Sequence, residues 1–165
     1  MELMTVIVII GLISATVALR LTGLTHQARF EWAIGQLTTC DATMRTYART
    51  HGQQASLCFE MGTSQLQRSY ASRSTNTKTV SLGENVSIHR FVSQGRDTSV
   101  GRVTVDFSAE GISPTYAIEL VFAGNKKQPV WLVFVGVTGQ VERQEQEYDV
   151  VRLVKGLATQ GDDTH

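Results

Sequence analysis

The sequence has few cysteines, the residues whose disulfides often hold small secreted proteins together. Only two cysteines, Cys40 and Cys58, occur among 165 residues, too few for a disulfide scaffold. They form either one disulfide, in an oxidising compartment, or two buried free thiols, and the sequence leaves both alternatives open. The formal net charge is zero, so no global charge indicates binding to nucleic acid or a membrane surface.

The sequence also lacks every arrangement typical of a catalytic or metal site. Its four histidines are dispersed, with no cysteine or acid at metal-ligand spacing. No phosphate-binding loop, dinucleotide-binding glycine motif or nucleophile elbow is present. We therefore expect no enzymatic activity and no cofactor.

Charge is absent from most of the first part of the chain. After Glu2, no charged residue occurs before Arg20. The apolar run Leu3–Leu19 corresponds to about 26 Å of helix, near the lower limit for crossing a hydrocarbon core of about 30 Å. Because the residues before it are not basic, the run favours a retained membrane anchor over a cleaved signal peptide.

Helical patterning continues beyond the apolar run and predicts a single helix of about 50 residues. No proline interrupts it, and Gly52 is a plausible cap after His51. Charged residues such as Asp41 and Arg45 occupy the positions between the apolar ones, which indicates a helix with one buried stripe. The predicted stripe is Leu21, Leu24, Ala28, Ile34, Leu37, Cys40, Met44, Tyr47 and His51. Trp32 lies off this stripe, where we expect a subunit or sheet contact.

After Gly52 the pattern changes to the period of two that is typical of strands. Turn-length connections between the segments predict an antiparallel sheet, and with the helix an α+β fold. Val130–Val137, which includes Trp131, is expected to be a buried central strand. The other predicted strands are 55–59, 80–82, 86–92, 102–107, 115–122 and 140–142, with 69–79 a loop or irregular edge strand and 150–154 an edge strand or short helix.

Four segments follow from these patterns. We expect a membrane-spanning half of the helix at 1–21, an amphipathic half at 22–52, an antiparallel β domain at 53–158 and a disordered tail at 159–165. Within the first segment, Gly11, Ser14 and Ala15 are small residues that allow helices to approach closely.

The start of the chain resembles type IV pilins and type II secretion pseudopilins. Its residues Glu2 to Ala15, ELMTVIVIIGLISA, are similar to the start of the mature helix in that family, and Glu2 matches the characteristic glutamate. In the family, a basic leader ending in glycine precedes the mature chain. We therefore expect Met1 to be an internal residue of a longer gene product.

The second half resembles the GspH/FimT group of minor pilins. That group has a phenylalanine–x–x–x–glycine turn, matched by Phe107–Gly111, then two strands and a closing glycine–arginine–valine. The closing motif is matched by Gly139, Gln140 and Val141, with glutamine in place of the arginine.

The resemblance implies a minor pseudopilin of a type II protein secretion system. It would be methylated at its amino terminus and anchored by a single span in the bacterial inner membrane, with its globular part in the periplasm. Its implied partners are other pseudopilins or pilins and the inner-membrane assembly platform, not nucleic acid. Glu2 would pair with the terminal amine of a neighbouring subunit and so set the register of the assembled helices.

The alternative is a FimT-like minor type IV pilin for pilus assembly or DNA uptake. Its support is an excess of basic over acidic residues between Arg45 and Arg102. The acidic carboxyl-terminal region and Gln140 argue against it.

Overall fold

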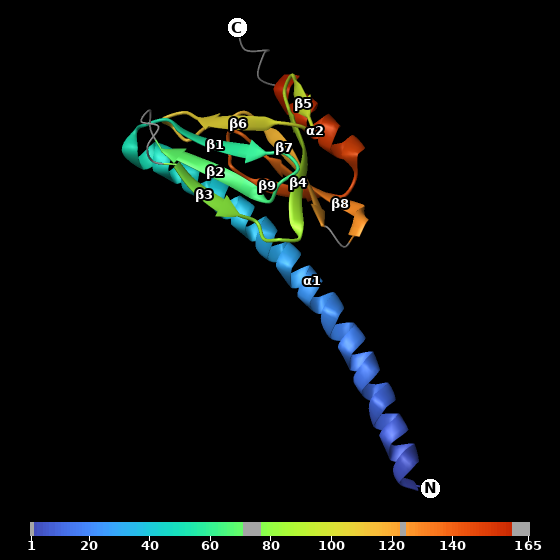
Figure 1. Ribbon diagram of the computed structural model, residues 1–165. Coiled ribbons are helices and arrows are strands. Elements are labelled where there is room, and N and C mark those ends of the chain that lie inside the picture. Colours follow the sequence, from blue (N-terminus) through green and yellow to red (C-terminus); the bar gives the residue numbers. More distant parts are fainter. Residues whose placement is uncertain (1, 71–76, 123–124, 160–165) are drawn as a thin grey trace. The chain divides into compact units, whose positions relative to one another are not determined.

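The computed structural model describes the backbone of residues 2–70, 77–122 and 125–159 (Figure 1). Side chains are described over the same ranges except at 2–5, 8–9, 11–26, 125–128 and 155–159. The chain divides into two units, Met1–Trp32 and Ala33–His165. We name the second unit the head.

The described elements are two helices and nine strands. Their order is α1 (Glu2–His51), β1 (Ala55–Glu60), β2 (Gln65–Tyr70), β3 (Thr77–Ser81), β4 (Val86–Ser93), β5 (Arg96–Thr98), β6 (Arg102–Phe107), β7 (Tyr116–Phe122), β8 (Asn125–Phe134), β9 (Val141–Gln144) and α2 (Glu147–Thr159). The predicted α+β class is confirmed.

Helix α1 ends where the sequence predicted. Gly52 follows His51 with a φ of 60°, a left-handed conformation that glycine adopts without strain. The Gln53 amide then donates to the Ala48 carbonyl over 3.2 Å, which satisfies one of the last carbonyls of the helix.

In the first unit, the side chains of Val6, Ile7 and Ile10 are exposed. Among the residues that the structure describes, no helix combines the length and the apolar character needed to cross a membrane. Most side chains of the predicted membrane-spanning half, 1–21, lie outside the described residues, so that half stays a prediction.

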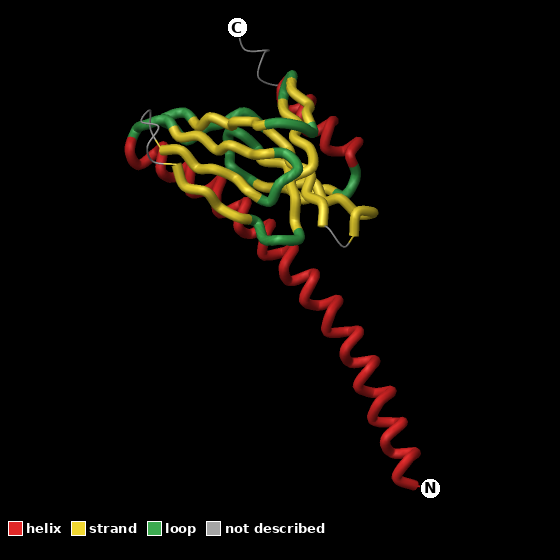
Figure 2. The backbone as a smooth tube through the Cα atoms, viewed as in Figure 1, coloured by secondary structure: helices red, strands yellow, loops and turns green. Residues whose placement is uncertain are grey.

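The head contains two antiparallel sheets (Figure 2). Sheet A has the order β3-β2-β1-β6, and sheet B has the order β5-β4-β7-β8-β9. All pairings are antiparallel, as the short connections predicted. Strand β8 lies between β7 and β9, so its apolar second half, which begins at Val130, is flanked on both sides as expected. The strand itself begins earlier than predicted, at Asn125, and ends at Phe134.

An aromatic cluster joins the two sheets. Phe59 of sheet A lies 5.9 Å from Tyr116 and 6.1 Å from Phe91, both of sheet B, between ring centroids. Tyr116 also stacks on Phe134 at 4.7 Å. All four rings are buried, so the cluster forms the centre of the main core.

Helix α2 covers part of the other face of sheet B. Val150 and Val154 pack there in a separate buried cluster with Val92, Trp131 and Val133. Trp131 is 2% exposed, which confirms that it is a core residue. Of the two structures expected for 150–154, the helix is the one observed.

The sequence missed β2 and β5. Strand β2 carries the sequence QLQRSY, in which only Leu66 is fully buried, so no apolar alternation marks it. Strand β5 has three residues and no apolar one. The strand expected at 80–82 is β3, which begins earlier, at Thr77. The expected tail falls largely on 160–165, outside the described residues.

The predicted helical stripe is correct in its centre and wrong at its edges. Leu37, Cys40 and Met44 are buried as predicted, whereas Ala28 and His51 are exposed. The buried face of α1 is instead completed by Ala33, Asp41, Arg45 and Ala48. The two charged residues in that set form the polar cluster described below.

Candidate functional site

A buried ion pair lies on the face of α1 that packs into the head. Arg45 Nε donates to Asp41 Oδ2 over 2.6 Å, and the side chains are 6% and 2% exposed. The spacing of four residues places them one turn apart on the same face of the helix. Because the charges are removed from water, each needs a full set of partners in the protein.

The Asp41 carboxylate receives a second partner from sheet B. The Tyr116 hydroxyl donates to Asp41 Oδ1 over 2.7 Å. Burial raises the pKa of Tyr116 well above its usual value, and the adjacent Asp41 carboxylate raises it further. The hydroxyl therefore stays protonated and serves as a permanent hydrogen-bond donor.

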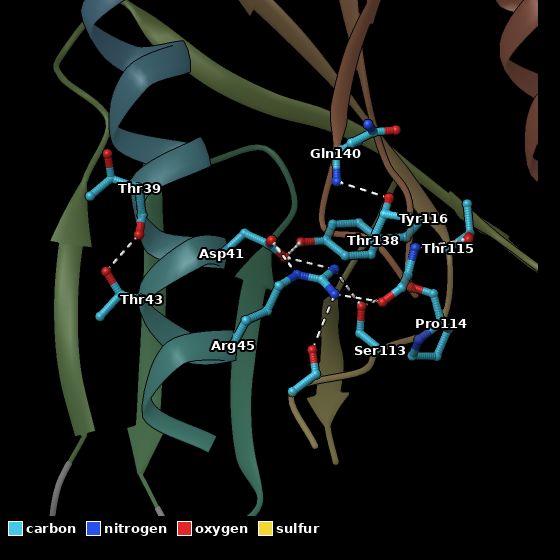
Figure 3. Close-up of polar contacts among 12 residues, drawn as sticks. Thr39, Asp41, Thr43, Arg45, Ser113, Pro114, Thr115, Tyr116, Thr138 and Gln140 are labelled. Atoms are coloured by element: carbon cyan, nitrogen blue, oxygen red, sulfur yellow. Dashed lines mark hydrogen bonds and ion pairs between the residues drawn. The ribbon is translucent and has the colours of Figure 1, made fainter. Parts of the chain in front are cut away.

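The Arg45 guanidinium extends to two loops beyond the helix (Figure 3). Its Nη1 donates to the carbonyls of Gly136 and Gly111 over 2.5 and 3.3 Å, and its Nη2 donates to Ser113 Oγ over 2.8 Å. It also lies over the Phe107 ring, 5.3 Å from the centroid. We name this set the clasp: Asp41, Arg45, Ser113 and Tyr116, together with the loops 108–115 and 135–140.

The loops of the clasp are packed too closely for larger residues. A Cβ atom on Gly136 would overlap the carbonyl oxygen of Ser113, which is backbone and cannot move aside. A Cβ atom on Gly139 would contact the Arg45 side chain at 3.1 Å. The Ser113 amide donates to the Gly136 carbonyl over 3.2 Å, so the loops are also bonded to each other.

The groups of the clasp attach α1 to the rest of the head. An ion pair with satisfied hydrogen bonds, a protonated tyrosine and backbone carbonyls hold α1 against the loops 108–115 and 135–140. Among the residues within the described ranges, no group of three or more histidine, cysteine or acidic side chains is arranged to hold a metal ion.

The sequence placed Asp41 and Arg45 on the polar side of the helix, and this prediction is wrong. The only signal was the acid–base spacing of four, which is ordinary on exposed helices. Their burial follows from contacts with residues more than 60 positions away, which helical periodicity does not contain.

The predicted assembly residue Glu2 and the predicted packing residues Gly11, Ser14 and Ala15 have side chains outside the described ranges. Their roles stay predictions. Trp32 is 52% exposed, as expected for a residue off the buried stripe, and its proposed contact also stays a prediction.

The structure has Cys40 and Cys58 as free thiols. Leu57 and Phe59 are buried, so the alternation of β1 directs the half-buried Cys58 to the opposite face of sheet A. Cys40 is buried on α1, where burial raises the pKa of its thiol and the charge of Arg68 opposes that effect. Of the two alternatives for the cysteines, the structure therefore has the unlinked one.

No protein-family model matches the sequence, and no curated protein matches it. Solved structures do match the fold. The type IV minor pilin FimU of Pseudomonas aeruginosa is similar over 73% of this chain and 92% of its own, with a TM-score of 0.51 and 10% identity. The minor pseudopilin EpsH of Vibrio cholerae is similar over 71% of this chain and 97% of its own, with a TM-score of 0.51 and 9% identity. The fold of this chain is therefore pilin-like.

Within this pilin-like fold, three of the turn residues that carried the resemblance of the second half lie around Arg45. Phe107 supplies the ring under Arg45, Gly111 supplies a carbonyl acceptor, and Gly139 lies against the arginine side chain. Gln140, at the position of the missing arginine, is exposed. The turn motifs thus have a physical role here, which is to receive Arg45.

Proposed function

We propose that this chain is a minor pseudopilin of a type II secretion system. The observation that carries the proposal is a head with the minor-pilin fold at the end of one helix, Glu2–His51, whose first residues resemble the pilin start. The protein acts by assembly, with no catalysis. Its run Leu3–Leu19 anchors it in the bacterial inner membrane, and the head lies in the periplasm.

The clasp suits a subunit that assembles through its helix, because it bonds that helix to the rest of the head. When pseudopilins or pilins assemble on the inner-membrane platform through their helices, any displacement of α1 must be passed on to the head. Arg45 bonds the helix to both loops, so helix and loops move together. A buried, fully paired cluster resists separation because parting its charges leaves them unsatisfied.

The proposal assigns Glu2 to the register of assembly. A carboxylate within an apolar helical environment needs a partner, and the amino terminus of a neighbouring subunit supplies it. Glu2→Gln, made in the full-length gene with its native upstream sequence, removes the charge with little change in size. We expect loss of the subunit from cross-linked complexes with its neighbouring subunits in the membrane and periplasm.

The matched control is Glu84→Gln, which removes a charge from an exposed turn of the head. Immunoblots of the cross-linked complexes and of total membranes measure assembly and expression separately. Normal incorporation of the Glu2→Gln protein would refute the proposal that Glu2 sets the register of the assembled helices.

The second candidate is a FimT-like minor type IV pilin. It is favoured by the FimU match, which equals the EpsH match in TM-score. Deletion of the gene separates the two: a secretion subunit is needed for the release of folded proteins, and a pilus subunit for pili or DNA uptake. Salt-dependent binding of duplex DNA by the full-length protein would favour the second.

A further inference from the structure

Sheet A ends on both sides in a strand with one neighbour. Among the described strands, β3 pairs with β2 alone and β6 with β1 alone, and the two form opposite margins of the sheet in Figure 1. Edge strands are often blunted by proline, a bulge or lysine. Strand β6 has none of these, and β3 has only Lys78, whose side chain alternates onto the face away from Thr77 and Thr79. Both edges can therefore accept a further strand.

The backbone groups that face outward on β6 follow from its hydrogen bonds to β1. The Met61 amide donates to the Gly101 carbonyl over 2.9 Å, and bonded and non-bonded pairs alternate along an antiparallel ladder. Every second residue from Gly101 therefore bonds to β1, and the residues between them point their N–H and C=O groups away from it. These outward-facing residues are Arg102, Thr104 and Asp106. The Arg102 carbonyl agrees with this phase, because it accepts from Arg96 of β5 over 3.4 Å.

The same reasoning identifies the outward-facing groups of β3. The Leu82 amide donates to the Ser64 carbonyl over 2.7 Å, which continues the register of the β2–β3 ladder. The residues whose backbone points away from β2 are Thr77, Thr79 and Ser81. On both edge strands, the outward-facing residues have exposed side chains, on the face of sheet A away from the buried Leu66 and Val103. The two edges therefore match in backbone phase and in face.

We infer that β3 of one copy adds to the β6 edge of a second copy and continues sheet A across two heads. The inference rests on the proposed function, which anchors all copies in one membrane with α1 in the same direction. Three antiparallel pairings separate β3 from β6, so a copy displaced sideways without rotation brings its β3 antiparallel to β6. Pairing of β6 with β6 about a twofold axis would instead reverse α1, which packs on this sheet through Tyr47 and Tyr70.

One register uses every outward-facing group of both strands. Its three pairs are Thr77–Asp106, Thr79–Thr104 and Ser81–Arg102. Each pair exchanges two backbone hydrogen bonds, and the two outer pairs also bring a hydroxyl to a charged side chain. Asp106 forms no ion pair with a described side chain. Arg102 donates to Glu60 through Nη2, and a guanidinium has further donors for a second acceptor.

The length of the open edge also matches its proposed partner. Beyond Asp106, the Ser108 amide donates back to the Ile112 carbonyl over 2.8 Å, so the open stretch is 102–106, as long as the five residues of β3. So short a pairing is weak by itself, and it gains effect when the helices already hold the heads close together. The pairing therefore aligns neighbouring heads, while the helices supply most of the assembly energy.

Cysteine cross-linking in the full-length protein tests the pairing. Thr79→Cys chains and Thr104→Cys chains, each with Cys58→Ser and a different epitope tag, are produced together, and their membranes are oxidised with copper phenanthroline. In the proposed register the two Cα atoms lie about 5.5 Å apart, within the range of a disulfide. We expect dimers that carry both tags. Within one chain the two positions are three strand spacings, about 14 Å, apart, so they cannot be linked to each other.

Gln67→Cys in place of Thr79→Cys is the matched control. Gln67 lies directly opposite Thr79 in the β2–β3 register, one strand further from the edge, so this mixture should give no dimer above background. A yield from the Thr79→Cys mixture no higher than that of the control would overturn the inference. Dimers formed by Thr104→Cys chains alone would overturn it as well, because they would show twofold pairing of β6 with β6.

The assay on Glu2→Gln separates this inference from the proposed function. Loss of that variant from the cross-linked complexes, without any disulfide between Thr79→Cys and Thr104→Cys chains, refutes the strand pairing and leaves the pseudopilin proposal standing. The disulfide, together with normal incorporation of Glu2→Gln, supports the pairing and refutes the role of Glu2.

Discussion

Two arginines join a helix to the sheets in this head, and they do so in different surroundings. Arg45 connects α1 to the loops with its side chain 6% exposed. Arg90 connects β5 and α2 to β4 through Asp97 and Glu147, at 2.7 Å each, with its side chain 28% exposed. Each guanidinium also lies over an aromatic ring, Phe107 or Trp131.

The comparison shows that similar contacts differ in consequence when their access to water differs. Removal of a partner from the Arg90 group leaves charges that water can solvate, so the loss is small. Removal of a partner from the clasp leaves a charge without solvent, and the loss is large. The Arg45 cluster holds α1 in place, and the Arg90 group holds α2.

The largest effect is expected from Arg45→Ala. This variant leaves the Asp41 carboxylate buried with one partner fewer, and we expect a loss of about 3–5 kcal/mol in the free energy of unfolding. Urea unfolding of the full-length protein in detergent, followed by tryptophan fluorescence, measures it. The double variant Asp41→Leu/Arg45→Met removes both charges and should recover part of the loss. A double variant no more stable than Arg45→Ala would contradict this account.

Gly136→Ala tests the close contact between the loops. The added methyl group would overlap the Ser113 carbonyl, and overpacking of this kind costs about 1–3 kcal/mol. Gly35→Ala is the control, because no atom lies within 4 Å of its added Cβ and alanine favours a helix. Equal unfolding midpoints for the two variants would show that the loops yield easily.

Tyr116→Phe should cost about 1–2 kcal/mol, because one hydrogen bond to a buried carboxylate is lost. It should also change the response to alkali. The pKa of Tyr116 is raised in the folded protein well above its usual value of about 10. Its contribution to stability is therefore complete below the usual pKa and is lost as the pH rises toward the folded pKa.

Unfolding midpoints at pH 8 and pH 11 measure this loss, which should be smaller in the Tyr116→Phe protein. Cys40, whose pKa is also raised, contributes in the same direction, so both proteins are compared in a Cys40→Ala background. An identical alkaline loss with and without the hydroxyl would refute the assignment.

Arg90→Ala should have the smallest effect, below about 1 kcal/mol. It removes both ion pairs of α2 and β5, and the change should shrink further in high salt because exposed charges are screened. Trp131 lies under the Arg90 guanidinium and packs in one cluster with Val150 and Val154 of α2, so its fluorescence reports any loosening of the helix. A loss as large as that of Arg45→Ala would break the comparison between the two arginines.

Much of the fold could be predicted from local patterns. The end of α1 at Gly52, strands β1, β4, β6 and β7, and the antiparallel arrangement follow from capping, alternation and short connections. Strand β2 could not, because its neighbours in the sheet, and not its own apolar residues, hold it in place. The clasp could not either, since Asp41 and Arg45 have the spacing of a surface pair.

The sequence by itself determined the long helix, the strand periodicity and the pilin resemblance, because these depend on residues close together in the chain. Only the tertiary structure decided how far the buried face of α1 extends beyond its predicted centre and that this face includes an ion pair. The reason is physical: the cost of burying Asp41 and Arg45 is offset by Tyr116, Ser113 and two glycine carbonyls, and these partners come together only when the chain folds.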